Sequence, residues 1–357
     1  MKKTPSIIHI IDSLEPGGAE HIAVMAANLF SRKQHKVALM YFNKKKNNIS
    51  EMLDENIELH YFKRNGKFNY FMKNKFFRII ENYDLLHVHL IHNLRYVWFI
   101  SLFSNSKLNI FFHDHGFSRL NFFQKKITEY ALTDATYICV NQSLTNFAEK
   151  NLGVKKSFIL ENMIDPITIR EDIKSSDKIY RFVLVSNLLP KKNILFAIKY
   201  FVELSKTIQN STLDIIGNVF DAEYFEICKR LISKNGLEKK ISFIHDKIQI
   251  QPILNNYHFG LHMSKKETGP LVLLEYLSQG LPFLSFMTGQ VSKKINRDFP
   301  SFFINDFIID NWVEKTLNLK TDIGEALTIK MKAYYQKNYS TDDYYNHCIK
   351  IYLSNLS

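Results

Sequence analysis

Two glutamates separated by seven residues are the side chains of this sequence best placed to do chemistry. Glu267 and Glu275 lie in HFGLHMSKKETGPLVLLEYLSQGLPFLSF, which spans residues 258–286. Carboxylates accept hydrogen bonds from hydroxyl groups, and a glycine-containing helix start such as the one between them can bind an anion. The pair therefore indicates a site for a phosphorylated polyol. The spacing alone leaves open that Glu267 is a solvated loop residue and that Glu275 lies on the polar side of a helix.

One βαβ unit positions the two carboxylates. Residues 259–264 and 282–286 are short apolar runs, typical of buried parallel strands, and a helical pattern lies between them. We expect Gly269 to be the N-cap of this helix, Pro270 its first residue and Gly280 its end. Ligands bind outside the carboxyl ends of the strands in open α/β sheets, so both glutamates should lie at that edge.

The stretch as a whole resembles the donor-site signature of family 4 glycosyltransferases, in the form S-x-x-E-T-G-P-L-V-L-L-E-Y-L-x-x-G-L-P. Such enzymes have the GT-B fold, take a nucleotide-sugar donor and retain the anomeric configuration. The resemblance implies that Glu275 holds the ribose hydroxyls of the donor, and that Glu267 contacts the transferred sugar and takes part in catalysis. The donor-binding residues that it implies in this stretch are Glu267, Thr268, Gly269, Pro270, Leu271 and Glu275, although Pro270 has no N–H to donate.

A glycine loop near the N-terminus follows a predicted strand at 6–11 and precedes a helical pattern at 19–30. Two glycines let the backbone approach a ligand closely, while a plain tight turn is the alternative. The sequence Gly17-Gly18-Ala19-Glu20 resembles the G-G-A-E element of the family. That resemblance implies that Gly17 and Gly18 belong to the donor-binding residues and face an interdomain cleft.

A lysine-containing loop, NLLPKKN, follows the predicted strand at 181–186. It is similar to the G-R-L-x-P-x-K-G element of the family, whose Arg and Lys grip the donor diphosphate. The resemblance implies a catalytic and donor-binding role for Lys192. Asn187 stands at the arginine position of this donor site, which removes a bidentate hydrogen-bond donor and a full charge. We expect Lys191, Lys265 or Lys266 to compensate.

Several histidines gather at the ends of two predicted strands: His87, His89, His92, His113 and His115. Such a group can suggest a metal site, but no Cys or His-Glu-x-x-His pattern accompanies it. Histidines at strand ends are often hydrogen-bonded residues of a cleft, and we expect no metal. The sequence His115-Gly116-Phe117 resembles the His-Gly element of the family, which implies that His115 is catalytic and faces the donor sugar. The neighbouring His113 is the alternative.

Strands alternate with helices in both halves of the chain. This predicts an α/β protein of two doubly wound Rossmann-like domains that face each other across a cleft, as in GT-B enzymes. We expect an N-terminal acceptor-side domain over 1–165, a nucleotide-sugar-binding domain over 166–340, and a C-terminal helix over 341–357 that crosses back to the first domain. The polar run 169–181 fits the linker. After residue 286 we expect only helices.

The composition is that of a globular protein, with 46% hydrophobic and 23% charged residues. No apolar run approaches the roughly 18 residues that span a bilayer, and the N-terminus turns polar too early for a signal peptide, so we expect a cytoplasmic location. The 3 cysteines are far apart and predict neither a disulfide framework nor a zinc site. The net charge of +12 favours anionic partners without choosing among membranes, nucleic acid and substrates.

Residues 67–80, KFNYFMKNKFFRII, interleave aromatic with basic side chains. At helical spacing such a segment could lie on an anionic membrane surface, which would make the protein peripheral on the inner face of the cell membrane. The alternative is an amphipathic helix that packs its apolar face on the protein and turns its basic face outward.

The resemblance to family 4 implies transfer of a sugar, of the hexosyl type, from a nucleotide-sugar donor, expected to be a UDP-sugar, to a glycan or lipid-linked acceptor in bacterial surface polysaccharide synthesis. No Asp-x-Asp pair is present, so basic groups and helix dipoles should stabilise the leaving diphosphate without a metal or other cofactor. The alternatives are a GT-B-type nucleotide-sugar epimerase or hydrolytic relative, and a non-catalytic protein that binds sugar nucleotides. Nucleic acid is not an expected partner, because no recognition motif accompanies the basic charge.

Overall fold

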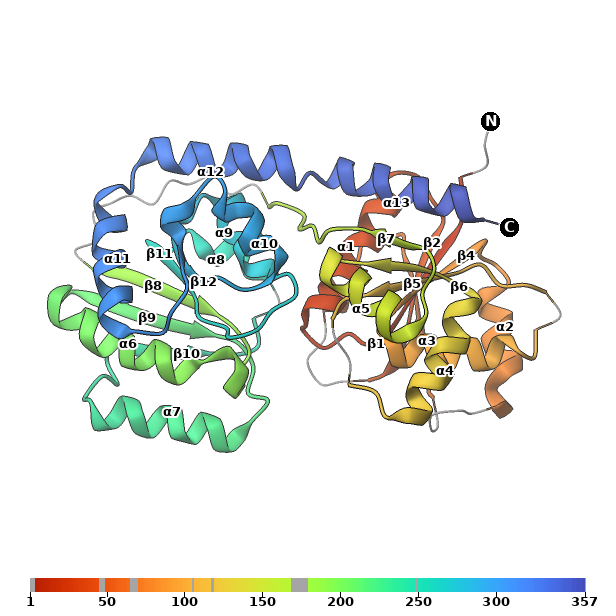
Figure 1. The fold of residues 1–357 in the computed structure, drawn as a ribbon, viewed down its shortest axis with the longest axis horizontal. Coiled ribbons are helices and arrows are strands. Elements are labelled where there is room, and N and C mark those ends of the chain that lie inside the picture. Colours follow the sequence, from red (N-terminus) through yellow and green to blue (C-terminus); the bar gives the residue numbers. More distant parts are fainter. Residues whose placement is uncertain are drawn as a thin grey trace. The chain divides into compact units, whose positions relative to one another are not determined.

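The chain divides into two compact units, each built around one parallel sheet. The computed structural model describes residues 4–44, 49–64, 70–104, 106–116, 119–167, 179–247 and 249–356. The first unit comprises Met1–Ile164 with Thr341–Ser357, and the second comprises Asp165–Ser340 (Figure 1). The greater part of the predicted linker 169–181, namely residues 169–178, lies outside the described residues.

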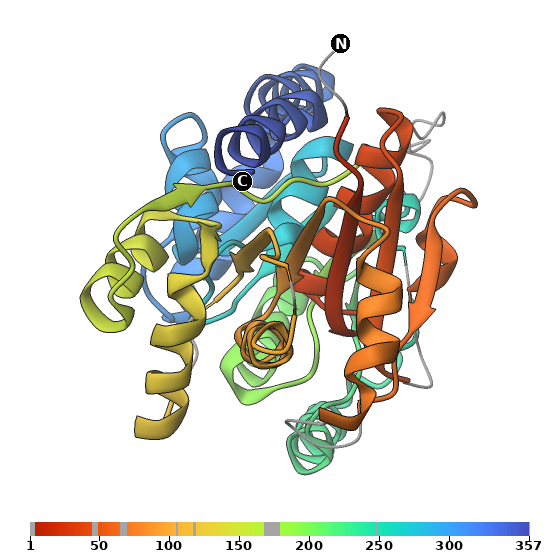
Figure 2. The same cartoon turned by 90° about the vertical axis from the view of Figure 1, so that its right-hand side faces the viewer.

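The first unit has a sheet in the order β3-β2-β1-β4-β5-β6-β7, and all its described pairings are parallel. Its strands are β1 Ile7–Ser13, β2 Val37–Asn43, β3 Glu58–Tyr61, β4 Leu85–His89, β5 Ile110–Asp114, β6 Ala135–Cys139 and β7 Ser157–Ile159. Its helices are α1 Gly18–Arg32, α2 Lys73–Ile80, α3 Ile91–Ser101, α4 Phe122–Thr133, α5 Gln142–Leu152 and α13 Thr341–Asn355. The central strands are almost continuously apolar because helices cover both faces of the sheet (Figures 1 and 2).

The C-terminal helix α13 belongs to the first unit and packs beside α1 on one face of its sheet. The Tyr352 ring lies 5.5 Å from Phe30 of α1 and 4.9 Å from Phe111 of β5, measured between ring centroids. At the start of α13, Asp342 forms an ion pair with Lys33 at 2.6 Å. The opposite face of the sheet carries the apolar core that includes Phe76 of α2 and residues of α3, α4 and α5.

The second unit has a parallel sheet in the order β10-β9-β8-β11-β12-β13. Its strands are β8 Tyr180–Val185, β9 Ser211–Ile216, β10 Ile241–Ile244, β11 Phe259–His262, β12 Phe283–Phe286 and β13 Phe303–Ile304. Its helices are α6 Ile194–Thr207, α7 Ala222–Lys234, α8 Gln251–Leu254, α9 Leu271–Gln279, α10 Gly289–Asn296, α11 Ile309–Thr321 and α12 Glu325–Asn338. In both units, strands alternate with helices as the sequence predicts.

Two boundary expectations for the second unit are wrong. The chain after residue 286 is not entirely helical, because Phe303 and Ile304 form the edge strand β13 beside β12. A strand of two residues is too short to show an alternating pattern. The helix α9 also begins one residue later than expected, at Leu271. Pro270 is its N-cap, because a ψ of 113° keeps the Pro270 backbone extended.

The described part of the basic-aromatic segment is a packing helix. Phe76 and Ile80 of α2 are buried in the core of the first unit, and Phe77 and Ile79 pack against it. Phe71, just before α2, is 93% exposed. Residues 67–69 of the segment lie outside the described residues. The apolar face of α2 is therefore occupied by the protein core and unavailable to lipid.

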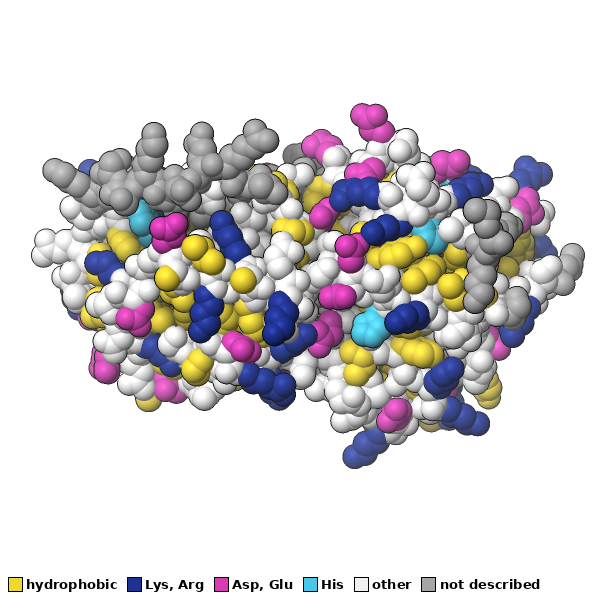
Figure 3. All heavy atoms as spheres, turned by 90° about the horizontal axis from the view of Figure 1, so that it is seen from above, with side chains coloured by type: hydrophobic (Ala, Val, Ile, Leu, Met, Phe, Trp, Pro, Cys, Tyr) yellow, Lys and Arg dark blue, Asp and Glu magenta, His cyan; other side chains and the backbone are white. Residues whose placement is uncertain are grey.

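Two further surface properties bear on the choice of partners. Among the described residues, no helix is both long and apolar enough to cross a membrane. On the face drawn in Figure 3, the described lysine and arginine side chains are interspersed with acidic ones. The described residues of that face therefore form no continuous basic stripe of the kind that follows a nucleic-acid backbone.

Candidate functional site

The βαβ unit of β11, α9 and β12 places Glu267 and Glu275 at the carboxyl end of β11. Gly260 of β11 lies directly under Tyr276 of α9, since a Cβ at Gly260 would come within 2.7 Å of the tyrosine ring. This close packing buries the apolar side of α9 and holds the helix in position over the strand. Glu267 lies in the loop between β11 and α9, and Glu275 lies on the helix.

Glu267 is held as a carboxylate by two basic neighbours. Its side chain forms an ion pair with Lys192, and the Nε2 atom of His262 lies 3.8 Å from its Oε1 atom. Its backbone N–H donates to the Thr288 hydroxyl at 3.0 Å, which fixes the loop. Burial alone would raise the pKa of Glu267, but the His262 ring and the Lys192 charge outweigh burial and lower it to about 2. Glu267 is therefore ionised at any physiological pH.

Lys192 reaches Glu267 from a distant part of the sequence. It ends a short 3₁₀ turn, Pro190–Lys192, that precedes α6. The two loops are also joined through their backbones, because the Lys265 N–H donates to the Lys191 carbonyl at 3.0 Å. The structure thus brings together the two residues that were expected to act on the sugar and the diphosphate.

Asn187, at the position where the resembling family 4 element has an arginine, makes a structural hydrogen bond. Its Oδ1 atom accepts a hydrogen bond from the Asn218 backbone N–H at 3.1 Å, which ties the loop after β8 to the loop after β9. The loops approach closely at Gly217, where a Cβ would come within 2.2 Å of the Ser186 carbonyl oxygen. Asn187 is therefore part of the framework that shapes this edge of the sheet.

Glu275 differs from Glu267 in having no partner among the described residues. Its carboxyl makes no hydrogen bond or ion pair with the residues that the structure describes. It is half-buried, and burial raises its pKa to about 7. A half-buried carboxyl without a partner, at the edge of the sheet where ligands bind, is a hydrogen-bonding group available to a ligand.

The loop from Thr268 to Leu271 is fastened to the start of α10. The Gln290 N–H donates to the Thr268 carbonyl at 3.1 Å, and Gly289 has the positive φ of 79°. A Cβ at Gly289 would come within 3.0 Å of the Thr268 carbonyl oxygen. Pro270 offers no side-chain cap to α9, so the first turn of this helix presents its N–H groups at the loop. Such N–H groups favour an anionic ligand.

In the first unit, Gly17 and Gly18 begin α1. Gly17 is the N-cap and has no side chain to bond the helix N–H groups. A Cβ there would lie 2.3 Å from the Oε2 atom of Glu20, so a side chain at residue 17 would displace the Glu20 carboxyl. Burial and the nearby charges of Asp12 and Glu15 raise the pKa of Glu20 to about 7. Glu20 is thus, like Glu275, a carboxyl with a raised pKa, and the sequence argument assigned it no role.

His115 belongs to a cluster of histidines on three adjacent strands. His9 of β1 pairs in register with His87 of β4, and His89 pairs in register with His113 of β5. These four are fully buried, and His115 is partly exposed. Sequence reasoning missed His9, although a histidine in the middle of the apolar run IIHII could have signalled it. His92 was expected nearby but is paired with Asp12 instead, at 3.2 Å.

The cluster forms two hydrogen-bonded rows of rings. In one row, His9 Nδ1 lies 3.1 Å from His89 Nε2, and His89 Nδ1 lies 2.9 Å from His115 Nε2. In the other row, His87 is bonded to the Tyr352 hydroxyl, and its Nε2 lies 3.3 Å from His113 Nδ1. The rows stack on each other, with the His87 and His89 rings 4.5 Å apart and nearly parallel.

Burial keeps these imidazoles neutral. It lowers the pKa of His9 and of His115 to about 3, and together with the neighbouring rings it lowers the pKa of His87, His89 and His113. Ligand nitrogens of two triads, His9-His87-His89 and His89-His113-His115, lie within 4.8 Å of one another, which is a spacing that a transition metal could use. A metal in either triad would have to displace a hydrogen bond of His89, because both nitrogens of that ring are bonded, whereas His9 Nε2 and His113 Nε2 have no hydrogen-bond partner among the described residues.

Comparisons with known proteins bear on one domain and on the fold of the whole chain. Residues 166–336 match the family described as Glycosyl transferases group 1. No curated protein sequence matches the chain. Among solved structures, HepE of Anabaena in complex with UDP and glucose is 16% identical with a TM-score of 0.78, and the match covers 99% of this chain and 100% of HepE.

Two other solved structures have the same arrangement of elements. A glycosyltransferase from Rickettsia africae is 15% identical with a TM-score of 0.80, over 99% of both chains. The lipopolysaccharide outer core galactosyltransferase WaaB is 18% identical with a TM-score of 0.64, over 98% of this chain and 100% of WaaB. The protein therefore has the GT-B fold of two Rossmann-like domains, and residues 166–336 match a group 1 glycosyltransferase domain.

Proposed function

We propose that this protein is a retaining glycosyltransferase of family 4 that moves a hexosyl unit from a UDP-sugar to a glycan or lipid-linked acceptor. The observation that carries the proposal is the Lys192–Glu267 ion pair at the loop that leads into α9, the helix that carries Glu275, within the domain that matches group 1 glycosyltransferases. The UDP and glucose bound to HepE support a nucleotide-sugar donor, and the galactosyl transfer named for WaaB supports transfer of a hexosyl unit.

The site residues of the second unit have distinct roles in this proposal. Glu275 accepts hydrogen bonds from the ribose hydroxyls, for which an unpartnered carboxyl is suited. Lys192 shifts from Glu267 to the diphosphate when the donor binds, and Glu267 then bonds the hydroxyls of the transferred sugar. The uncapped first turn of α9 adds N–H groups for the developing negative charge.

The reaction in this proposal needs no metal. Lys192 and helix N-termini stabilise the leaving diphosphate, and the leaving phosphate oxygen accepts the proton of the acceptor hydroxyl. His115 rather than His113 is the histidine that meets substrate, because His113 is fully buried while His115 has some exposure. The low pKa of His115 makes it a neutral hydrogen-bonding group rather than a cation.

We further propose a place for the enzyme in the synthesis of a bacterial surface polysaccharide, in the cytoplasm or at the inner face of the membrane. A lipid-linked acceptor would supply the membrane contact. This part rests on the resemblance to family 4 and on the outer core lipopolysaccharide named for WaaB.

A panel of nucleotide sugars tests the proposal. The donor should raise the melting temperature of the wild type, and Glu275→Gln should reduce that increase. Glu314→Gln is the matched control, because Glu314 is an exposed glutamate on α11 of the same unit. Product analysis with the stabilising donor then separates the alternatives. Transfer requires an acceptor, whereas an epimerised or hydrolysed sugar without acceptor, or binding without turnover, would contradict the proposal.

A further inference from the structure

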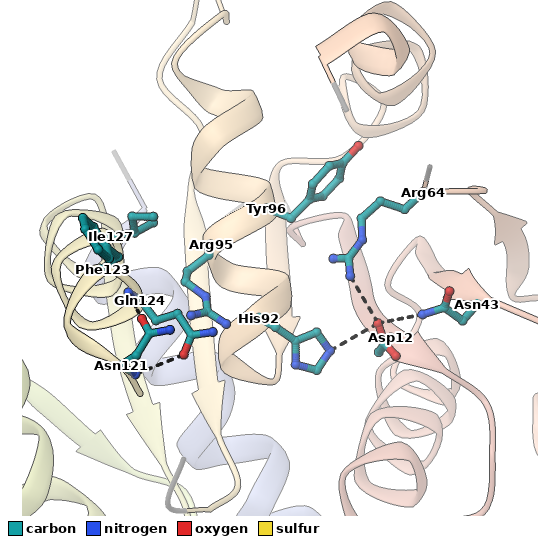
Figure 4. Close-up of a pocket in the computed structure, with 10 residues that line it drawn as sticks. All are labelled: Asp12, Asn43, Arg64, His92, Arg95, Tyr96, Asn121, Phe123, Gln124 and Ile127. Atoms are coloured by element: carbon teal, nitrogen blue, oxygen red, sulfur yellow. Dashed lines mark hydrogen bonds and ion pairs between the residues drawn. The ribbon is translucent and has the colours of Figure 1, made fainter. Parts of the chain in front are cut away.

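A cavity of about 410 Å³ lies within the first unit, at the carboxyl ends of its central strands. Asp12 near the end of β1 and Asn43 at the end of β2 line one side, together with Arg64 (Figure 4). Side chains of α3 and of the start of α4 line the rest, among them Arg95 and Gln124. The volume lies within the range of small-molecule sites, and the position is where open α/β sheets bind ligands.

The positive charge of the cavity is only partly balanced. Arg64 lies 3.8 Å from Asp12 and stacks over the rings of Phe42 and Tyr96 at 5.2 and 5.3 Å. Asp12 also accepts a hydrogen bond from Asn43 at 3.0 Å, so its carboxylate is shared among several partners.

Arg95, on the other side, is half-buried and makes no ion pair or hydrogen bond with the described residues. Burial and the charge of Arg64 lower its pKa. Two guanidinium groups therefore face one cavity that has a single, shared carboxylate.

The start of α4 adds to the positive potential. Asn121 and Gln124 form a capping box, in which the Gln124 N–H donates to Asn121 Oδ1 at 2.9 Å and the Asn121 N–H donates to Gln124 Oε1 at 3.2 Å. A capping box satisfies only part of the helix N–H groups, and the rest of the first turn attracts anions. Phe123, which lines the same cavity, is 77% exposed. It gives the cavity an open aromatic wall.

We propose that this cavity binds the phosphate group of a phosphorylated sugar, with Arg95 and Arg64 on the phosphate and Phe123 against the sugar ring. Two guanidinium groups and a helix N-terminus match a doubly charged phosphate, and guanidinium groups bind phosphate oxygens in pairs. If the protein is the proposed glycosyltransferase, this ligand is its acceptor. The binding of a phosphorylated sugar in this cavity does not itself depend on that function. Free phosphate carries the same anionic group as a phosphorylated sugar. Contacts with the sugar ring are what would make the phosphorylated sugar bind more tightly.

The test compares the binding of inorganic phosphate, a hexose 1-phosphate and the uncharged hexose by isothermal titration calorimetry. We expect the hexose 1-phosphate to bind more tightly than phosphate and the uncharged hexose not to bind measurably. Arg95→Gln should weaken binding of the hexose 1-phosphate by about tenfold or more, which is the usual worth of a charged hydrogen bond. The matched control is Arg78→Gln, an exposed arginine on α2 of the same unit, which should bind as the wild type does.

Gln124→Glu keeps the inference testable if Arg95→Gln does not fold. Glutamate can still complete the capping box, so the helix should be retained, but its charge would repel an anion in the cavity. UDP affinity is measured in each variant and should not change, because the residues proposed for the ribose and the diphosphate, Glu275 and Lys192, lie in the second unit. Equal binding of phosphate and hexose 1-phosphate, or normal binding by Gln124→Glu, would overturn the inference. A wild type that binds hexose 1-phosphate but no UDP-sugar would instead refute the proposed donor.

Discussion

The partnerless carboxyl of Glu275 makes the stability of the protein depend on pH in a defined direction. Its pKa is raised from 4.5 to about 7 in the folded protein. Between these values the unfolded chain has lost the proton while the folded protein still holds it. The free energy of unfolding therefore falls as pH rises through this window, and the penalty is fully present above about pH 7.

The magnitude follows from the same two pKa values. Each pH unit corresponds to about 1.4 kcal/mol, so complete desolvation would cost about 3 kcal/mol at pH 8. Because the Glu275 side chain keeps partial contact with solvent, screening reduces this to about 1–3 kcal/mol. Glu275→Gln removes the ionisation while nearly preserving the shape. We expect the variant to gain about 1–3 kcal/mol over the wild type between pH 4.5 and pH 8.

Unfolding by urea from pH 4.5 to 8 measures this difference between variant and wild type. Other titrating groups, including the histidine cluster and Glu267, are present in both proteins and cancel in the comparison. Glu314→Gln, at an exposed position, should show no such trend. If the difference between Glu275→Gln and the wild type is the same at every pH, the carboxyl is not desolvated and the argument fails.

Binding of UDP gives a second measure of the protonation of Glu275. A carboxylate that accepts ribose hydroxyl bonds must be ionised in the complex, so UDP binding near pH 6 should release part of a proton. Calorimetry in buffers of different ionisation enthalpy detects that proton. Loss of the hydrogen bonds in Glu275→Gln should weaken UDP binding by about 1.5–3 kcal/mol. The terminal phosphate of UDP also titrates at about pH 6, so the difference between the two proteins is what reports on Glu275. Equal proton release by the wild type and Glu275→Gln would remove the ribose assignment.

Four further outcomes follow from the structure. Lys192→Ala should slow sugar transfer by about 10²–10³, as expected for a lost electrostatic donor, and unchanged turnover would show that the diphosphate binds elsewhere. Asn187→Arg should destabilise the protein by about 1–3 kcal/mol, because it leaves the Asn218 N–H without its acceptor, and it should not speed transfer; a faster variant would mean that the site has merely lost its arginine. Phe76→Ala should cost about 3–5 kcal/mol of unfolding free energy, whereas Phe71→Ala should be near neutral; the reverse order, or anionic vesicles that bind wild type but not Phe71→Ala, would contradict a packing role for this segment. Dialysis against a chelator should leave turnover and melting temperature unchanged, and a loss that zinc restores would place a metal among the histidines.

Much of the fold could be predicted because its signals are local. Short apolar runs such as 259–264 mark buried parallel strands, and helical patterns lie between them, so the sequence leads directly to two Rossmann-like domains. Element ends were less certain, as the N-cap at Pro270 and the two-residue strand β13 demonstrate. A short edge strand is defined by its partner β12 rather than by its own residues.

The candidate site, like the fold, could be predicted from the sequence only in part. The sequence by itself placed Glu267 and Glu275 in the loop after β11 and on α9, because both positions follow from one local βαβ pattern. Only the tertiary structure decided that Glu267 is paired with Lys192 while Glu275 has no partner. Those two environments give two glutamates opposite pKa shifts, because burial and neighbouring charge depend on residues far apart in the chain.

The histidines and the cavity of the first unit depend still more on the tertiary structure. The sequence supplied the histidines of β4 and β5, but the sheet order β1-β4-β5 added His9 from the other end of the domain. In the same way Arg64 and Arg95, which no motif connects, face one cavity because their strands and helices meet at the carboxyl edge of the sheet. Local sequence determines which elements form, whereas charge pairing, burial and cavities arise only when non-local elements are packed together.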